Sequence, residues 1–153
     1  MQKRANRIRL CTVLLVLNVV FIWGNSLLPG SVSGAISGWI KDILASIFHF
    51  GSDDPSAGHG LLRKLAHFTE FTCLGALFAW LYGMLQKPAW LALIYGFSAA
   101  CVDETIQRFV PDRGPSFLDV IIDTSGVLLG IGIVLIGYLI YKKKKLKFIL
   151  EET

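Results

Sequence analysis

Ionisable side chains that could do chemistry gather in two short stretches of this sequence. The first, Lys64, His67 and Glu70, has a three-residue spacing that places neighbouring members on one face of a helix. The second lies within residues 101–126 and contains Asp103, Glu104, Gln107, Arg108, Arg113, Asp119 and Asp123. A histidine beside carboxylates can act as a general acid or base. Arginine and lysine can hold phosphate or carboxylate groups.

The elements that must position these residues are predicted to be membrane helices. The 153-residue chain is 54% hydrophobic and 17% charged, whereas soluble domains have about 25% charged residues. Three cysteines, Cys11, Cys73 and Cys101, lie inside apolar runs, so no disulfide is predicted. The net charge of +4 comes from basic residues that flank apolar runs, which favours a role in membrane orientation over nucleic-acid binding.

Four apolar runs are long enough to be spanning helices, at about 10–28, 65–85, 89–109 and 117–141. The first run has an alternative interpretation as a cleaved signal peptide, because Ser31-Val32-Ser33 has the small-x-small form of a cleavage site. Residues 35–50 have helical apolar spacing but are too short and polar to span, which predicts an interfacial helix. An ordinary helix packed on the spans is the alternative. Residues 29–34 and 51–60 are expected to be loops, and Gln86-Lys87-Pro88 a tight turn.

The predicted fold is therefore an all-α membrane protein in a single domain over 1–153, with four transmembrane helices and an interfacial helix between spans 1 and 2. With the N-terminus in the cytoplasm, ten of the 15 Lys and Arg residues fall on the cytoplasmic side. The positive-inside rule thus favours cytoplasmic N- and C-termini.

This topology brings the polar ends of three spans to the same side of the membrane. Span 2 begins there, span 3 ends there and span 4 begins there. At about 1.5 Å per residue, Glu70, Asp103 and Asp123 are expected roughly 6–10 Å from the ends of their spans. Charges inside spans are costly and usually functional. We therefore expect a partly paired polar network open to the extracytoplasmic face.

Several of these residues also have structural alternatives. Arg63 and Lys64 can snorkel at a helix end, and His67 and Glu70 can satisfy each other. Asp119 suits the positive end of a helix dipole. The motif Gly126-x-x-x-Gly130 is typical of helix packing.

In combination, these residues resemble the VanZ-like family of small bacterial membrane proteins over roughly residues 10–140. The matching motifs are K-x-x-H-x-x-E-F from Lys64, D-E-x-x-Q from Asp103, P-x-R from Pro111, S-x-x-D from Ser116 and G-x-x-x-G from Gly126. One departure is Asp123, where the family often has Asn. The resemblance implies a bacterial cytoplasmic-membrane protein. It also implies a link to teicoplanin resistance without matching vancomycin resistance, because that is the association of the family's namesake.

Three function classes remain open from the sequence. The first is binding of an envelope lipid, a lipid-linked cell-wall precursor or a lipoglycopeptide, with Lys64, Gln107, Arg108, Arg113, Asp119 and Asp123 as ligand contacts. The second is a hydrolase or transferase on a lipid-linked substrate, with His67, Glu70, Asp103 and Glu104 as acid–base groups. The third is a transporter or proton relay, for which the inner halves of spans 2–4 offer few polar residues.

A metal-dependent version of the enzyme could use His67, Glu70, Asp103, Glu104 and Asp123 as nitrogen and oxygen ligands. Lys64 and the two arginines, Arg108 and Arg113, would disfavour a cation, so the sequence assigns no metal site and no cofactor. The expected partners are membrane lipids and the ligands named above, without nucleic acid. The sequence does not specify the oligomeric state.

Overall fold

In the residues that the structure describes, five α-helices follow one another, and every secondary-structure element is helical. The computed structural model describes residues 2–48, 59–114 and 116–151. The helices are α1 (Gln2–Ser26), α2 (Gly30–Phe48), α3 (His59–Leu85), α4 (Trp90–Gln107) and α5 (Phe117–Glu151). The all-α prediction is confirmed for this part of the chain.

Three of these helices are long and apolar enough to cross a membrane: α1, residues 61–85 of α3, and α5. They make the chain a membrane protein. The remaining predicted span, α4, is 18 residues long and is not among them. Asp103, Glu104 and Gln107 in its last turns lower its hydropathy, so a four-span topology stays a prediction.

Helices α1, α3 and α5 each extend beyond one end of their predicted spans. A membrane span ends at the first polar residues, whereas a helix can continue through them. Arginine, lysine and glutamine are good helix formers. Accordingly α1 begins at Gln2, eight residues before the predicted span, and α5 continues through a lysine run at residues 142–147 to Glu151. Likewise α3 begins at His59, so Gly60 is helical although a loop was predicted there. Glu70 consequently lies roughly 16 Å from the start of its helix rather than 6–10 Å.

The segment after α1 was also predicted wrongly, because α2 begins at Gly30 and not at residue 35. Pro29 immediately precedes the helix, a position where a missing N–H costs nothing. A glycine is needed at position 30 because the backbone of the α4–α5 loop lies against it, and not because the chain forms a loop there. Its N–H donates to the Pro111 carbonyl oxygen at 3.1 Å, and a Cβ there would collide with the Asp112 carbonyl oxygen. The loop predicted at 51–60 lies mostly outside the described residues.

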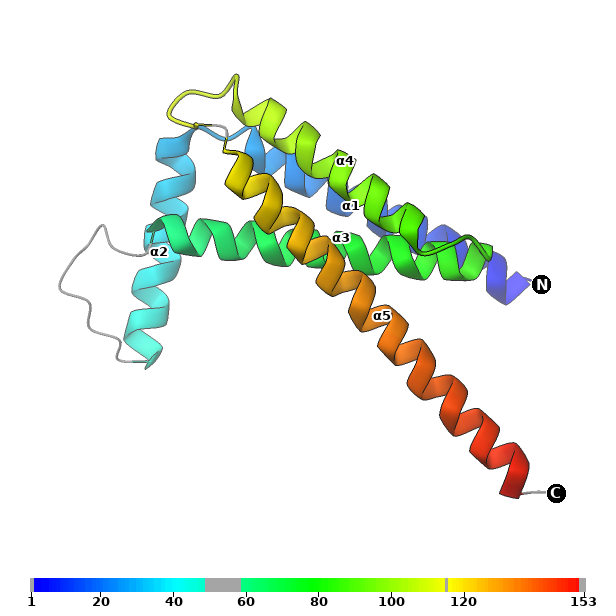
Figure 1. Cartoon of the computed structure of the whole chain (residues 1–153). Coiled ribbons are helices and arrows are strands. Elements are labelled where there is room, and N and C mark those ends of the chain that lie inside the picture. The colour runs from blue at the N-terminus through cyan, green and yellow to red at the C-terminus, as the bar shows by residue number, and fades with distance from the viewer. Residues whose placement is uncertain (1, 49–58, 115, 152–153) are drawn as a thin grey trace.

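The core is formed where α1, α3, α4 and α5 meet, around Ile22, Phe71, Leu74, Ala100 and Val127. α5 crosses α3 closely, and its distal half then leaves the bundle (Figure 1). In the same view α2 runs across the direction of α1 and α3, at the end where α3 begins. The predicted turn between α3 and α4 is confirmed, with Gln86 at φ 57° and the Lys87 N–H bonded to the Tyr82 carbonyl oxygen.

The predicted packing role of Gly126 and Gly130 is confirmed. A Cβ on Gly130 would collide with the Thr72 carbonyl oxygen, and one on Gly126 would lie 2.5 Å from the Phe68 carbonyl oxygen. The two glycines therefore let the α5 backbone lie directly on α3. This crossing sets the distance between the polar residues on the two helices.

Candidate functional site

Four helix ends meet at one end of the bundle. They are the end of α1, the beginning of α3, the end of α4 and the beginning of α5. Arg113, in the α4–α5 loop, joins them. Its Nε donates to the Leu28 carbonyl oxygen at 2.9 Å and its Nη2 to the Asn25 carbonyl oxygen at 3.0 Å. Burial, and then the nearby positive charge of Arg63, lower the pKa of Arg113. A guanidinium nevertheless stays protonated in proteins, so this arginine is a buried positive charge.

His67 lies at the centre of this end, between acids from two helices. Its Nδ1 is 4.0 Å from Glu70 Oε2 on the same helix and 3.8 Å from Asp103 Oδ2 on α4. Asp123 on α5 completes the group, with ligand atoms of His67, Asp103 and Asp123 all within 4.8 Å of one another. All three side chains are buried. We call these three residues the central triad.

Amide and hydroxyl groups of α1 and α4 hold Asp103 of the central triad and the neighbouring Glu70. Gln107 Nε2 donates to Asp103 Oδ2 at 2.8 Å and lies 3.4 Å from Ser26 Oγ. Asn25 Nδ2 donates to Glu70 Oε1 at 3.1 Å. One oxygen of each of these two acids therefore has a fixed partner, which orients the carboxyl group.

Further polar contacts surround the central triad. Lys64 forms an ion pair with Asp119, with Nζ 3.3 Å from Oδ1, and its side chain is 43% exposed. Glu104 Oε2 accepts the Ser116 backbone N–H at 2.9 Å, which ties the loop to α4. Ser116 Oγ in turn accepts the Leu118 N–H at the start of α5.

The structure thus brings together most of the residues singled out in the sequence, from three helices and a loop. Arg108 is the exception. It is exposed at the C-cap of α4, and no hydrogen bond or ion pair joins it to the group among the described residues. Its role as a ligand contact stays a prediction.

Sequence reasoning missed two contributors from α1, Asn25 and Ser26. Both are neutral, and they reach the acids only through tertiary packing, so no spacing within the sequence pointed to them. It also treated Arg63 only as an anchor. Arg63 in fact lines the small polar cavity with Lys64, His67, Glu104, Gln107, Asp119, Ile122 and Asp123. This cavity measures about 10 Å³, which is room for about one water molecule.

Two larger apolar grooves lie elsewhere on the surface. One, of about 480 Å³, runs between α1 and the first half of α3 and includes Glu70 in its wall. Its lining residues are Asn18, Phe21, Leu62, Leu65, Ala66, Thr69, Glu70 and Cys73. The other, of about 710 Å³, lies between α3 and α5 toward the far end of the bundle, near Lys87 and Tyr141. Only the first groove, which we call the α1–α3 groove, reaches the polar site.

Comparison with known proteins gives one family match. A family model described as VanZ/LLP1 matches residues 11–141, which include every residue of the site described above. No curated protein and no solved structure matched the chain in the same comparisons.

Proposed function

The chain belongs to the VanZ/LLP1 family, and from that membership we propose that it binds an amphiphile of the bacterial envelope at the polar end of its bundle. The ligand is an envelope lipid, a lipid-linked cell-wall precursor or a lipoglycopeptide antibiotic of the teicoplanin type. Binding of such an antibiotic would give resistance to teicoplanin without resistance to vancomycin.

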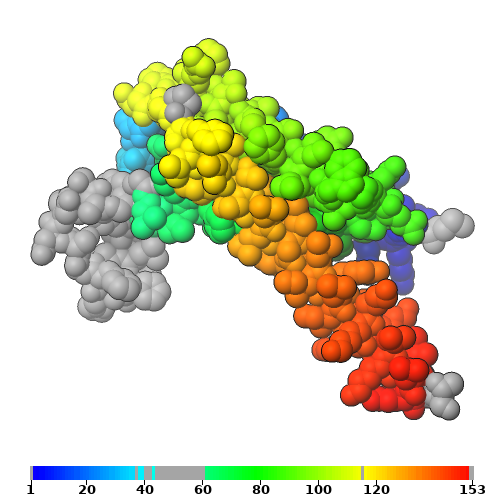
Figure 2. Space-filling view, in the orientation of Figure 1, coloured from blue at the N-terminus to red at the C-terminus, as the bar shows by residue number. Residues whose placement is uncertain are grey.

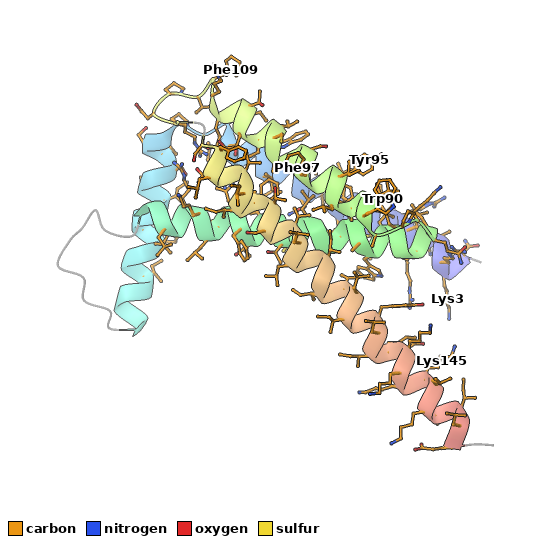
Figure 3. All side chains as sticks on the ribbon, in the orientation of Figure 1. Lys3, Trp90, Tyr95, Phe97, Phe109 and Lys145 are labelled. Carbon is orange, nitrogen blue, oxygen red and sulfur yellow. The ribbon has the colours of Figure 1, made fainter. Side chains whose placement is uncertain are left out.

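The proposal places a single domain in the cytoplasmic membrane with four spans, α1, α3, α4 and α5, and α2 in the interface. α4, although short, measures about 27 Å, close to the roughly 30 Å of a bilayer core. Lys3 and Lys145 lie toward the end of the molecule away from Phe109 and the α4–α5 loop (Figure 3). This arrangement supports cytoplasmic termini and a polar site that faces outward.

One observation favours an amphiphile: the α1–α3 groove is lined mostly by apolar side chains and includes Glu70 of the polar site in its wall. Leu62 and Leu65 of this lining flank Arg63 and Lys64 in the sequence. The polar cavity itself is too small for a headgroup. An acyl chain would therefore lie in the groove and the headgroup would rest on the rim, against Lys64 and the exposed Arg108. Arg113 Nη1, buried and without a hydrogen-bond partner among the described residues, is a further donor. Gln107, Asp119 and Asp123 would shape the polar wall.

Antibiotic susceptibility tests this function. Cells that express the wild-type chain should tolerate more teicoplanin than empty-vector cells and show unchanged vancomycin susceptibility. Ala66→Trp, which fills the α1–α3 groove, should abolish the protection at matched expression. Ile133→Trp, which places the same indole ring at an exposed position of α5, should retain it. Equal teicoplanin susceptibility in wild-type and empty-vector cells would refute the resistance role.

The position of His67 favours a second candidate, a hydrolase or transferase acting on a lipid-linked substrate. A histidine within 4.0 Å of two carboxylates has the arrangement of a general acid–base group. Glu70 and Asp103 would orient it. Glu104 holds the loop through Oε2 and would act through Oε1, which has no hydrogen-bond partner among the described residues. Under this alternative, His67→Gln should change the pool of lipid-linked precursors in expressing cells, and under pure binding it should not.

A further inference from the structure

The central triad places one imidazole and two carboxylates from three helices around a common point. His67, Asp103 and Asp123 are 7%, 0% and 1% exposed. Their ligand atoms all lie within 4.8 Å of one another, and His67 Nδ1 is 3.8 Å from Asp103 Oδ2. That separation is too long for a hydrogen bond. It fits two ligands of one ion, because metal–ligand distances of about 2.0–2.2 Å put adjacent donors roughly 3–4 Å apart.

Four polar atoms of the triad lack hydrogen-bond partners among the described residues. They are His67 Nδ1, Asp103 Oδ1 and both carboxylate oxygens of Asp123. Buried polar atoms are nearly always paired, and buried charges are paired or coordinate metals. Asp123 is the clearest case, since its whole carboxyl group is buried between helices with no donor.

The neighbouring cations do not fill this need. Lys64 pairs with Asp119, and Arg113 donates to two backbone carbonyl oxygens. Of the basic residues expected to disfavour a cation, Lys64 is thus paired with Asp119, Arg113 directs Nε and Nη2 to backbone oxygens, and Arg108 is exposed at the C-cap of α4. The carboxylates of the site are Glu70, Asp103, Glu104, Asp119 and Asp123, and its cations are Arg63, Lys64 and Arg113. If all are ionised, two negative charges remain, which is the charge that one divalent ion neutralises.

We propose that His67, Asp103 and Asp123 bind one divalent transition-metal ion. Imidazole nitrogen with carboxylate oxygen is a ligand set suited to Zn²⁺ or Mn²⁺ rather than to Ca²⁺ or Mg²⁺. Gln107 donates to Asp103 Oδ2 and holds that ligand in place, as outer-shell partners of metal ligands do. The water-sized cavity beside the triad leaves room for one further ligand. The ion would join α3, α4 and α5.

Metal analysis of the purified full-length chain tests this site directly. Protein in detergent is stripped with EDTA, dialysed against Zn²⁺ and analysed by inductively coupled plasma mass spectrometry. Wild type should retain one Zn²⁺ per chain. Asp103→Asn and Asp123→Asn should each weaken binding at least about 100-fold, because loss of an outer-shell partner alone costs about 10–100-fold. Asp119→Asn, the same change at an acid paired with Lys64, should retain the ion.

Thermal unfolding separates loss of binding from loss of folding. Zn²⁺ should raise the Tm of wild type and of Asp119→Asn, because an ion bound only by the folded state stabilises it. It should leave the Tm of folded Asp123→Asn unchanged. A wild-type chain that binds no Zn²⁺ or Mn²⁺, or equal binding by wild type and both triad variants, would overturn the proposal. Since neither a lipid-linked precursor nor an antibiotic is added, this result is independent of the proposed function.

Discussion

Arg113 shows how a single residue can determine the geometry of the whole polar end. It comes from the α4–α5 loop and binds two carbonyl oxygens at the end of α1, so it joins segments 85 and 88 residues apart. It is 8% exposed. The sequence indicated a positive charge here, but its partners are backbone atoms, which no side-chain pattern reveals. Asn25 and Ser26 were missed for the related reason that their partners lie on other helices.

Removal of Arg113 should destabilise the folded protein strongly. Arg113→Ala removes two charge-assisted hydrogen bonds, to the Leu28 carbonyl oxygen and to the Asn25 carbonyl oxygen, which keeps the Leu28 N–H as a second donor. Hydrogen bonds to charged groups contribute about 1.5–3 kcal/mol each. We therefore expect the free energy of unfolding to fall by about 3–5 kcal/mol, measured by denaturant titration in detergent. Arg108→Ala, a matched change at an exposed arginine, should stay within about 0.5 kcal/mol of wild type. Equal effects of the two variants would contradict the contacts assigned to Arg113.

At the scale of elements, the close crossing of α3 and α5 sets the distance between His67 on α3 and Asp123 on α5. Glycines at 126 and 130 bring α5 onto the α3 backbone, one and two turns beyond Asp123. The sequence allowed the packing motif and the number of helices to be predicted. It did not allow the helix ends to be predicted, because the boundary of an apolar run marks the membrane and not the last helical residue. The start of α2 was missed since Gly30 was attributed to a loop, whereas it serves a close contact.

Gly130→Ala should therefore destabilise the helix crossing. The added methyl group collides with the Thr72 carbonyl oxygen and lies 2.6 Å from the Ala76 nitrogen, and overpacking of this kind costs about 1–3 kcal/mol. Gly137→Ala on the same helix meets nothing within 4 Å. It should be neutral or stabilise by up to about 1 kcal/mol, because alanine favours helix over glycine. Thermal unfolding of both variants measures the difference, and a Gly137→Ala effect as large as that of Gly130→Ala would argue against this crossing.

On the scale of the whole molecule, the chain has two unlike ends. One end holds the central triad, the α4–α5 loop and α2. The other holds the N-terminal basic residues and, on the distal part of α5, the lysine run, which extends away from the rest of the bundle (Figure 2). Arg4 Nη2 donates to the Met84 carbonyl oxygen at 2.6 Å, so the start of α1 lies beside the end of α3. The positive-inside rule associates clusters of Lys and Arg residues, such as those at this end, with the cytoplasmic side of the membrane.

The two ends should accordingly lie on opposite sides of the membrane. In cells, a single cysteine placed at Gly114, in a chain whose three native cysteines are replaced, should react with a membrane-impermeant maleimide. A cysteine at Lys87, in the turn beside the N-terminus of α1, should react only after the cells are permeabilised. The reverse pattern of labelling would invert the topology and place the polar site in the cytoplasm.

The most direct test of the central claim is equilibrium binding of labelled teicoplanin to the purified chain in lipid nanodiscs. We predict saturable binding by wild type, absent for vancomycin and for teicoplanin without its acyl chain. Ala66→Trp should weaken teicoplanin binding at least about 10-fold. Losing roughly 1.4 kcal/mol from burial of the acyl chain in the α1–α3 groove is enough for a tenfold change in affinity. Ile133→Trp should bind as wild type does. Binding of teicoplanin no greater than to empty nanodiscs, or unaffected by Ala66→Trp, would contradict the account.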